Sequence, residues 1–178
     1  MNSIDWEALA RQVGTLTDSG ESGGDQHAKR ALVNLLGEEA IQGAVAHYVA
    51  GRPGSELARS VLSLLQPAWA MTECYRLYRT SGNPAVRSTA VELLRVVANG
   101  DALIWIAGFL ADDDPCVQTW GIGVLDQLVW RRHINNDDAE PLLVLAAQHP
   151  SAAVREQAAL IRSVIADRQD ANNAEASH

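Results

Sequence analysis

Five segments of the chain repeat the same order of apolar and polar residues. Each segment is apolar or small at its first, fifth and eighth positions, which fall on one face of an α-helix. The first residues of successive segments are 29, 29, 31 and 37 positions apart, so the period is that of a repeat protein. The pattern therefore predicts five repeated helices, at residues 28–36, 57–65, 86–94, 117–125 and 154–162.

A partner helix is predicted before each repeated segment. Gly37, Gly51, Gly82 and Gly100 mark the joints, because glycine commonly ends a helix. No segment alternates convincingly with the period of two that a strand requires, so strands are not expected. One helix pair cannot cover its own apolar face, whereas five stacked pairs bury a continuous core. The predicted partner helices are 4–16, 38–50, 67–80, 101–111 and 137–148.

The repeat defines a single domain that covers residues 1–167. Two segments fall outside the repeat. Residues 17–25 are rich in Gly, Ser and Asp, and we expect a flexible loop there. Residues 168–178 are rich in Asn, Asp, Ala and Ser, and we expect a disordered C-terminal tail.

Polar residues next to prolines predict where the repeated helices begin. Asn83 precedes Pro84, and Asp114 precedes Pro115. Proline fits the first turn of a helix, and the residue before it is then a natural N-cap. The runs 112–114 and 135–138 also lie just before predicted helices. Because neither run has the spacing and glycine of a calcium loop, we interpret both as caps rather than metal sites.

These motifs resemble the HEAT family of helical repeats, whose second helix opens with a turn, Asp-Pro or similar, and Val-Arg. Residues 83–87 (Asn-Pro-Ala-Val-Arg) and 153–155 (Ala-Val-Arg) match that opening, and residues 114–118 match it except that Gln118 replaces arginine. The resemblance implies a right-handed α-solenoid of about five antiparallel helix pairs. It also implies that Arg87 and Arg155 pair with acidic residues in loops.

Composition and charge narrow the range of partners. Basic residues number 14 and acidic residues 22, so the formal net charge is −8, which disfavours binding to nucleic acid. The two cysteines, Cys74 and Cys116, belong to no CxxC motif and are expected to be buried free thiols, as in a reducing compartment. The first residues do not have the pattern of a signal peptide, and no stretch is apolar enough to span a membrane. We therefore expect a cytoplasmic monomer.

No motif for catalysis, for a cofactor or for a metal ion is present in the sequence. The glycine-containing loop at 17–25 does not have the Gly-Lys-Ser/Thr of a phosphate-binding loop. The five histidines form no HExxH, HxH or Cys/His cluster, so zinc is not supported. We expect no enzymatic activity and no cofactor.

Tryptophan and the outward positions of the repeated helices supply the candidate contact residues. Trp6, Trp69 and Trp105 lie among apolar residues and are expected to pack. Trp120 stands at the fourth place of its repeat, on the flank of the helix, and Trp130 is followed by three basic residues. Both have an alternative role in packing. Trp and Arg are enriched at binding hot spots. The candidate partner-binding residues are Arg30, Arg59, Glu92, Arg95, Trp120, Asp126, Trp130 and Arg131.

Three functions remain open on this basis. The first is a protein-binding scaffold, and within it a small immunity protein whose acidic surface inhibits a basic, nuclease-like toxin. The second is a HEAT-like DNA repair glycosylase, which would use the concave arginines and stack tryptophans on a damaged nucleotide. The third is an accessory subunit of a cofactor-attaching lyase. The charge and the lack of catalytic motifs favour the first.

Overall fold

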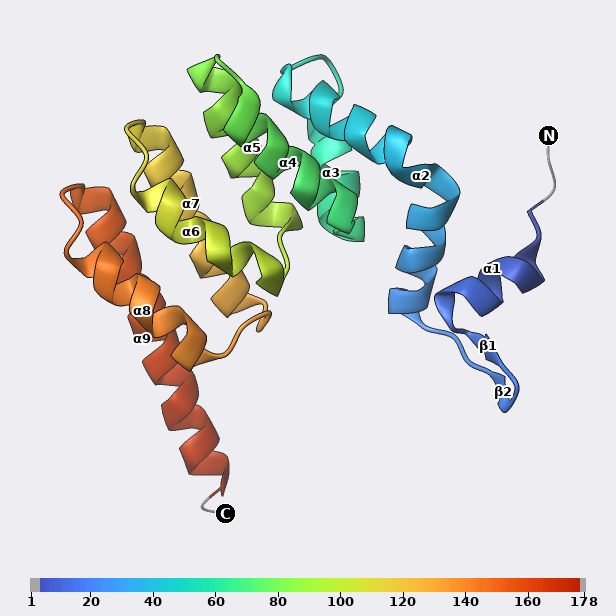
Figure 1. Cartoon of the computed structure of the whole chain (residues 1–178). Coiled ribbons are helices and arrows are strands. Elements are labelled where there is room, and N and C mark those ends of the chain that lie inside the picture. Colours follow the sequence, from blue (N-terminus) through green and yellow to red (C-terminus); the bar gives the residue numbers. More distant parts are fainter. Residues whose placement is uncertain (1–3, 177–178) are drawn as a thin grey trace.

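The computed structural model of the chain describes residues 4–176, and the surroundings of side chains up to residue 171. The described part is helical apart from one short hairpin, which confirms the all-α prediction (Figure 1). Among these helices, none is both long enough and apolar enough to cross a membrane. The elements are α1 (Trp6–Val13), β1 (Leu16–Thr17), β2 (Gly20–Glu21), α2 (Asp25–Val49), α3 (Ser55–Leu65), α4 (Ala68–Thr80), α5 (Pro84–Val97), the 3₁₀-helix η1 (Gly100–Ala102), α6 (Leu103–Leu110), α7 (Pro115–Trp130), α8 (Asn136–Ala147) and α9 (Ala152–Ala176).

Three helices begin at the caps that the sequence predicts. The Asn83 side chain accepts a hydrogen bond from the N–H of Ala85 at 3.0 Å, at the start of α5. The Asp114 side chain accepts one from the N–H of Cys116 at 2.8 Å, at the start of α7. A reciprocal pair of hydrogen bonds joins residues 135 and 138 at the start of α8. These capping side chains therefore satisfy free N–H groups in the first turn of each helix.

The predicted helices pack in chain order in two rows. The repeated helices α3, α5, α7 and α9 pack successively against one another, and α4, α6 and α8 each pack against the helix that follows (Figure 1). Phe109, Leu93, Leu94, Ile122 and Leu125 belong to the core of these helices and are almost completely buried. Burial of such side chains is the main stabilising term for a helical domain.

The joint between the first two helix pairs is a kink of one residue. Gly37 falls at the predicted joint, where its non-helical backbone divides α2 (Asp25–Val49) into two helical halves. The kink has φ 78° and ψ 165° at Gly37, a backbone conformation that side-chain-bearing residues rarely adopt. Figure 1 shows the first half of α2 bending away from the rows, together with α1.

The segment 17–25 is not simply a loop. Leu16–Thr17 and Gly20–Glu21 form a two-stranded antiparallel hairpin, so the expectation that the chain has no strands is wrong at this place. The Thr17 hydroxyl donates a hydrogen bond to the carbonyl of Gly20 at 3.0 Å and closes the turn. Two residues per strand are too few to show an alternating pattern in the sequence.

The C-terminal segment is helical where a disordered tail was expected. Helix α9 continues to Ala176, and residues 177 and 178 lie outside the described residues. Arg168 donates hydrogen bonds to the carbonyls of Val129 at 2.9 Å and Trp130 at 3.2 Å, and its guanidinium lies over the Trp130 ring. These contacts hold α9 against the end of α7. The polar composition alone gave no indication of this anchor.

Two predictions of burial are wrong. Trp6 was expected to pack, but at the first residue of α1 it is 64% exposed. Cys116 is exposed in the first turn of α7, whereas Cys74 is buried as expected. Burial raises the pKa of the Cys74 thiol, since the thiolate would have to be desolvated. The sequence placed Trp6 and Cys116 in helices, but it did not show whether each side chain faces the core or the solvent.

One of the two arginine pairs implied by the family resemblance is present. Arg87 forms an ion pair with Asp112, whose carboxylate also accepts a hydrogen bond from the Tyr78 hydroxyl at 2.9 Å. Arg155 instead donates to the main-chain carbonyls of residues 149 and 150, at 2.6 and 2.7 Å. The acidic partner expected for Arg155 is therefore wrong, and its bonds stabilise the turn before α9.

Candidate functional site

A pocket of about 320 Å³ lies on the face where α5, α7 and α9 meet. Three of the predicted contact residues, Arg95, Trp120 and Asp126, line this pocket. We call it the Trp120 pocket. Its remaining lining residues are Thr119, Ile122, Gly123, Ala153, Glu156, Gln157 and Leu160.

Arg95 and Trp120 form the centre of the Trp120 pocket. The guanidinium carbon of Arg95 lies 5.1 Å from the centre of the Trp120 ring, within the range of a cation–π interaction. Trp120 is half-buried and packs against the core, so both roles considered for it from the sequence are combined. The indole is thus held in place while part of it remains accessible.

Gly123 allows Arg95 to approach α7 closely. A Cβ atom at Gly123 would lie 3.1 Å from Cδ of Arg95, which is tighter than an ordinary contact. The Nε atom of Arg95 is buried and has no hydrogen-bond partner within the described residues. A buried donor without a partner costs free energy, so the close packing of Arg95 against α7 has an energetic cost.

Acidic and apolar side chains surround this pair. Asp126 and Glu156 line the Trp120 pocket from α7 and α9, and Leu160 is 59% exposed beside them. One cation, two carboxylates, an indole and an exposed leucine form a mixed surface of the kind found at protein–protein interfaces. This lining offers an apolar anchor point together with charges that set orientation.

The candidate residues named from the sequence did not include the other seven lining residues of the Trp120 pocket, Ala153 and Gln157 among them. Gln157 occupies the fourth place of its repeat, which is also the place of Trp120. Comparing equivalent places on neighbouring helices would therefore have identified it. Ala153 is small and carries no such signal.

Arg59 and Glu92, also predicted to bind a partner, contact each other. The Nε atom of Arg59 on α3 lies 3.6 Å from a carboxylate oxygen of Glu92 on α5. The hydroxyl of Tyr48 on α2 donates a hydrogen bond to the same carboxylate. Burial, and then the bond to Glu92, raise the pKa of the Tyr48 hydroxyl above its usual value. This cluster joins three helices, so its charges are already paired.

Trp130 and Arg131 lie outside the Trp120 pocket, at the other end of α7. The Arg131 guanidinium donates a hydrogen bond to the carbonyl of Val96 at 2.9 Å, and desolvation by burial lowers its pKa. Trp130 is 60% exposed, with the guanidinium of Arg168 over its ring at 5.1 Å. Arg131 therefore connects the ends of α7 and α5, and Trp130 stands apart from Trp120.

Arg30 lies in the N-terminal part of the structure, apart from the other predicted residues. Its guanidinium donates a hydrogen bond of 3.4 Å to the carbonyl of Val13. Together with Lys29, it lines a separate cavity of about 370 Å³ between the first half of α2 and the joint of α3 and α4. The arginines expected on the concave surface are thus separated: Arg30 lines this cavity, Arg59 pairs with Glu92, and Arg95 lines the Trp120 pocket.

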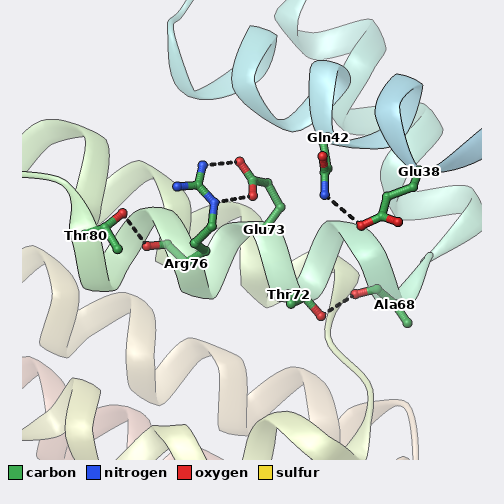
Figure 2. A network of polar contacts seen from close by, with 7 residues as sticks. All are labelled: Glu38, Gln42, Ala68, Thr72, Glu73, Arg76 and Thr80. Atoms are coloured by element: carbon green, nitrogen blue, oxygen red, sulfur yellow. Dashed lines mark hydrogen bonds and ion pairs between the residues drawn. The ribbon is translucent and has the colours of Figure 1, made fainter.

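A polar network lies where α2 packs against α4 (Figure 2). Arg76 donates two hydrogen bonds of 2.6 Å to the buried carboxylate of Glu73 on α4, and this bonding raises the pKa of Arg76. Gln42 and Glu38 on α2 form a hydrogen bond of 2.9 Å nearby. These contacts satisfy charges where α2 and α4 pack, and they are structural.

Within residues 4–176, no three His, Cys, Asp or Glu side chains are grouped so that they could hold a metal ion. Comparisons with protein-family models, with characterised proteins and with solved structures find no match for this chain. The function therefore has to be inferred from the geometry of the chain itself.

Proposed function

We propose that this chain is a HEAT-like α-solenoid that acts as a non-catalytic scaffold and binds another protein at the Trp120 pocket. The observation on which this rests is the convergence of Arg95, Trp120 and Asp126 from two helices at one accessible pocket. Trp and Arg dominate binding hot spots because each buries a large area and still donates hydrogen bonds.

The order of the helices supports the solenoid part of the proposal. The repeated segments fall on α2, α3, α5, α7 and α9, and the last four of these pack successively. The outward positions of successive repeats then form one continuous surface, which is how repeat proteins present extended binding sites. The Trp120 pocket lies on that surface.

The charge of the chain supports a basic partner. The formal net charge is −8, and Asp126 and Glu156 border the pocket, so a positively charged protein would be attracted and oriented. Within the scaffold class we propose an immunity role, in which the chain covers a basic, nuclease-like toxin domain. An exposed Leu160 beside the carboxylates would give such a partner an apolar contact.

The DNA repair alternative ranks lower because its basic stripe is not free. Arg59 is paired with Glu92, and Arg95 is stacked on Trp120 next to two carboxylates. Phosphate groups would meet these acids as well as the arginines. No described feature favours an accessory role with a lyase.

The experiment that tests the proposal is purification of the tagged full chain from its own cells at moderate salt, followed by mass spectrometry. One stoichiometric protein that is retained by the wild type and lost from Trp120→Ala supports the scaffold function. Ile104→Ala is the control, because Ile104 is exposed on α6 and does not line the pocket. Recovery of nucleic acid or of a small molecule, with no protein, would overturn the proposal.

A further inference from the structure

Helix α3 has an apolar face that no part of the described chain covers. Leu57, Val61 and Leu64 are 70%, 38% and 59% exposed, and their spacing of four and three residues places them on one side of the helix. Leu62 and Leu65 are buried on an adjacent face of the helix. We call the three exposed residues the α3 stripe. A contiguous apolar patch of this kind marks an interaction surface.

The α3 stripe occupies the first, fifth and eighth places of its repeat. In the later repeats the same places are buried, apart from the half-buried Val86 in α5, and a preceding repeated helix packs against each of these helices: α3 before α5, α5 before α7, and α7 before α9. In α9, the last of the series, Ala159 in the sixth place is exposed. The first, fifth and eighth places therefore face the preceding repeat. Their buried occupants are Ala90 and Leu93 in α5, Val117 and Val124 in α7, and Val154, Ala158 and Ile161 in α9.

The repeat that precedes α3 is the first half of α2, and its leucines are also open. Leu32, Leu35 and Leu36 are all exposed and lie within about one helical turn. We call these three residues the α2 patch. The α2 patch and the α3 stripe are thus two apolar surfaces in one chain, both without cover.

The chain cannot bring its own first half of α2 back over the α3 stripe. The two halves of α2 are separated by a single non-helical residue, Gly37. Helix–helix connections that reverse direction generally use two residues or more. The joints after α3 and after α7 are accordingly longer, with two residues (66–67) and five residues (131–135) between the helices. Closure within one chain would therefore require unwinding of α2.

We propose that two copies of this chain form a symmetric dimer, in which the α2 patch of each copy packs on the α3 stripe of the other. A two-fold axis makes both contacts at once, since each copy offers both surfaces. The inference is independent of the partner proposed for the Trp120 pocket, which lies on α5, α7 and α9. It departs from the monomer expected from the sequence.

Light scattering coupled to size exclusion tests the dimer. One chain has a mass of 19.2 kDa, so a dimer has twice that mass, 38.4 kDa. The full chain at tens of micromolar is expected at the dimer mass, and the double variant Leu57→Glu/Leu64→Glu at the monomer mass with unchanged helical circular dichroism. Ile104→Glu, at an apolar site on α6 that is 81% exposed, is expected to remain a dimer. A wild type at the monomer mass, or a dimer that the double variant leaves intact, would overturn the proposal.

Cross-linking identifies the occupant of the stripe independently of mass. In a Cys116→Ser background, one tagged copy carries Leu36→Cys and an untagged copy carries Leu57→Cys; Cys74 is buried. A short bis-maleimide is expected to join the tagged copy to the untagged copy in the mixture. A chain that carries both substitutions and cross-links only within itself would show closure of the monomer and contradict the dimer. Absence of either product, or capture of an unrelated protein instead, would contradict it as well.

Discussion

Gly121 on α7 lies directly against Phe109 on α6. A Cβ atom built on Gly121 would lie 2.5 Å from Cβ of Phe109, closer than real Cβ atoms approach. Phe109 is completely buried and contacts the ring of Tyr78 edge-on, with centroids 4.9 Å apart. The absence of a side chain at Gly121 thus sets the distance between the helices of this pair.

Gly121→Ala is therefore expected to destabilise the fold by about 1–3 kcal/mol, as overpacked core substitutions do. The matched control is Gly108→Ala on α6, where no atom lies within 4 Å of the added Cβ. That change is expected to stabilise the protein by up to about 1 kcal/mol, through the higher helix propensity of alanine. Urea unfolding of both variants measures the difference. Equal free energies of unfolding would show that the close approach is not required.

Asp112 is expected to matter far more than its neighbour in the same loop. Its nearly buried carboxylate is bound by Arg87, by the Tyr78 hydroxyl and by the N–H of Asp114. Asp112→Ala removes all three interactions and should cost about 2–4 kcal/mol. Asp113→Ala, at an exposed position, should change the free energy of unfolding by less than about 0.5 kcal/mol. Similar losses in the two variants would contradict the assignment.

The two cysteines are expected to react very differently with a thiol reagent. Cys116 is exposed, whereas Cys74 is buried and its pKa is raised by desolvation and by the nearby charge of Glu73. Ellman's reagent at neutral pH should label one thiol in the native protein and two in denaturant. Cys116→Ser should abolish the native labelling. Labelling of two thiols without denaturant would mean that the α4 region opens readily.

Stability is expected to fall at alkaline pH because of Tyr48. Its pKa is raised in the folded protein, whereas in the unfolded chain it releases its proton near the usual pH of about 10. Above that pH the unfolded state binds fewer protons than the folded state, so the free energy of unfolding decreases. Below it, this contribution is fully present.

Tyr48→Phe tests the contribution of that proton. The variant should lose stability at neutral pH, because it lacks the hydrogen bond to Glu92, and should decline less steeply than the wild type above pH 10. Denaturant midpoints between about pH 8 and pH 11 measure both slopes. Parallel curves would show that the Tyr48 hydroxyl does not titrate with unfolding.

Much of the fold could be predicted from the sequence because the helical signals are local. The caps at Asn83 and Asp114 depend on residues within one turn, and the apolar positions of α5, α7 and α9 repeat at helical spacing. Such signals do not depend on the rest of the chain. The predicted repeated helices accordingly fall on α2, α3, α5, α7 and α9.

What could not be predicted depends on contacts between distant segments. Gly37 marks a joint that was predicted, but its sequence context does not show that this joint is a kink of one residue rather than a loop. The helical extension of α9 depends on Arg168 reaching the carbonyls at the end of α7, 38 and 39 residues earlier. The exposure of Trp6 depends on which distant segments pack against the first turn of α1.

Part of the candidate site could be predicted, because the outward positions of a single helix follow from its repeat. The outward places of the repeats identified Arg95 and Asp126, and the unusual fourth place identified Trp120. Arg59 and Glu92 were also placed outward, but their mutual pairing across α3 and α5 could not be read from either helix alone. The charges of Arg59 and Glu92, which the prediction treated as free to bind a partner, are therefore already paired with each other.

The most direct test of the proposed function is the dissociation constant of the recovered partner for the wild type, Trp120→Ala and Ile104→Ala. The account predicts that Trp120→Ala weakens binding by at least about tenfold, the loss of roughly 1.4 kcal/mol expected of a hot-spot residue, and that Ile104→Ala binds as the wild type does. Circular dichroism of each variant controls for folding. Equal affinity of folded Trp120→Ala and the wild type would contradict binding at the Trp120 pocket.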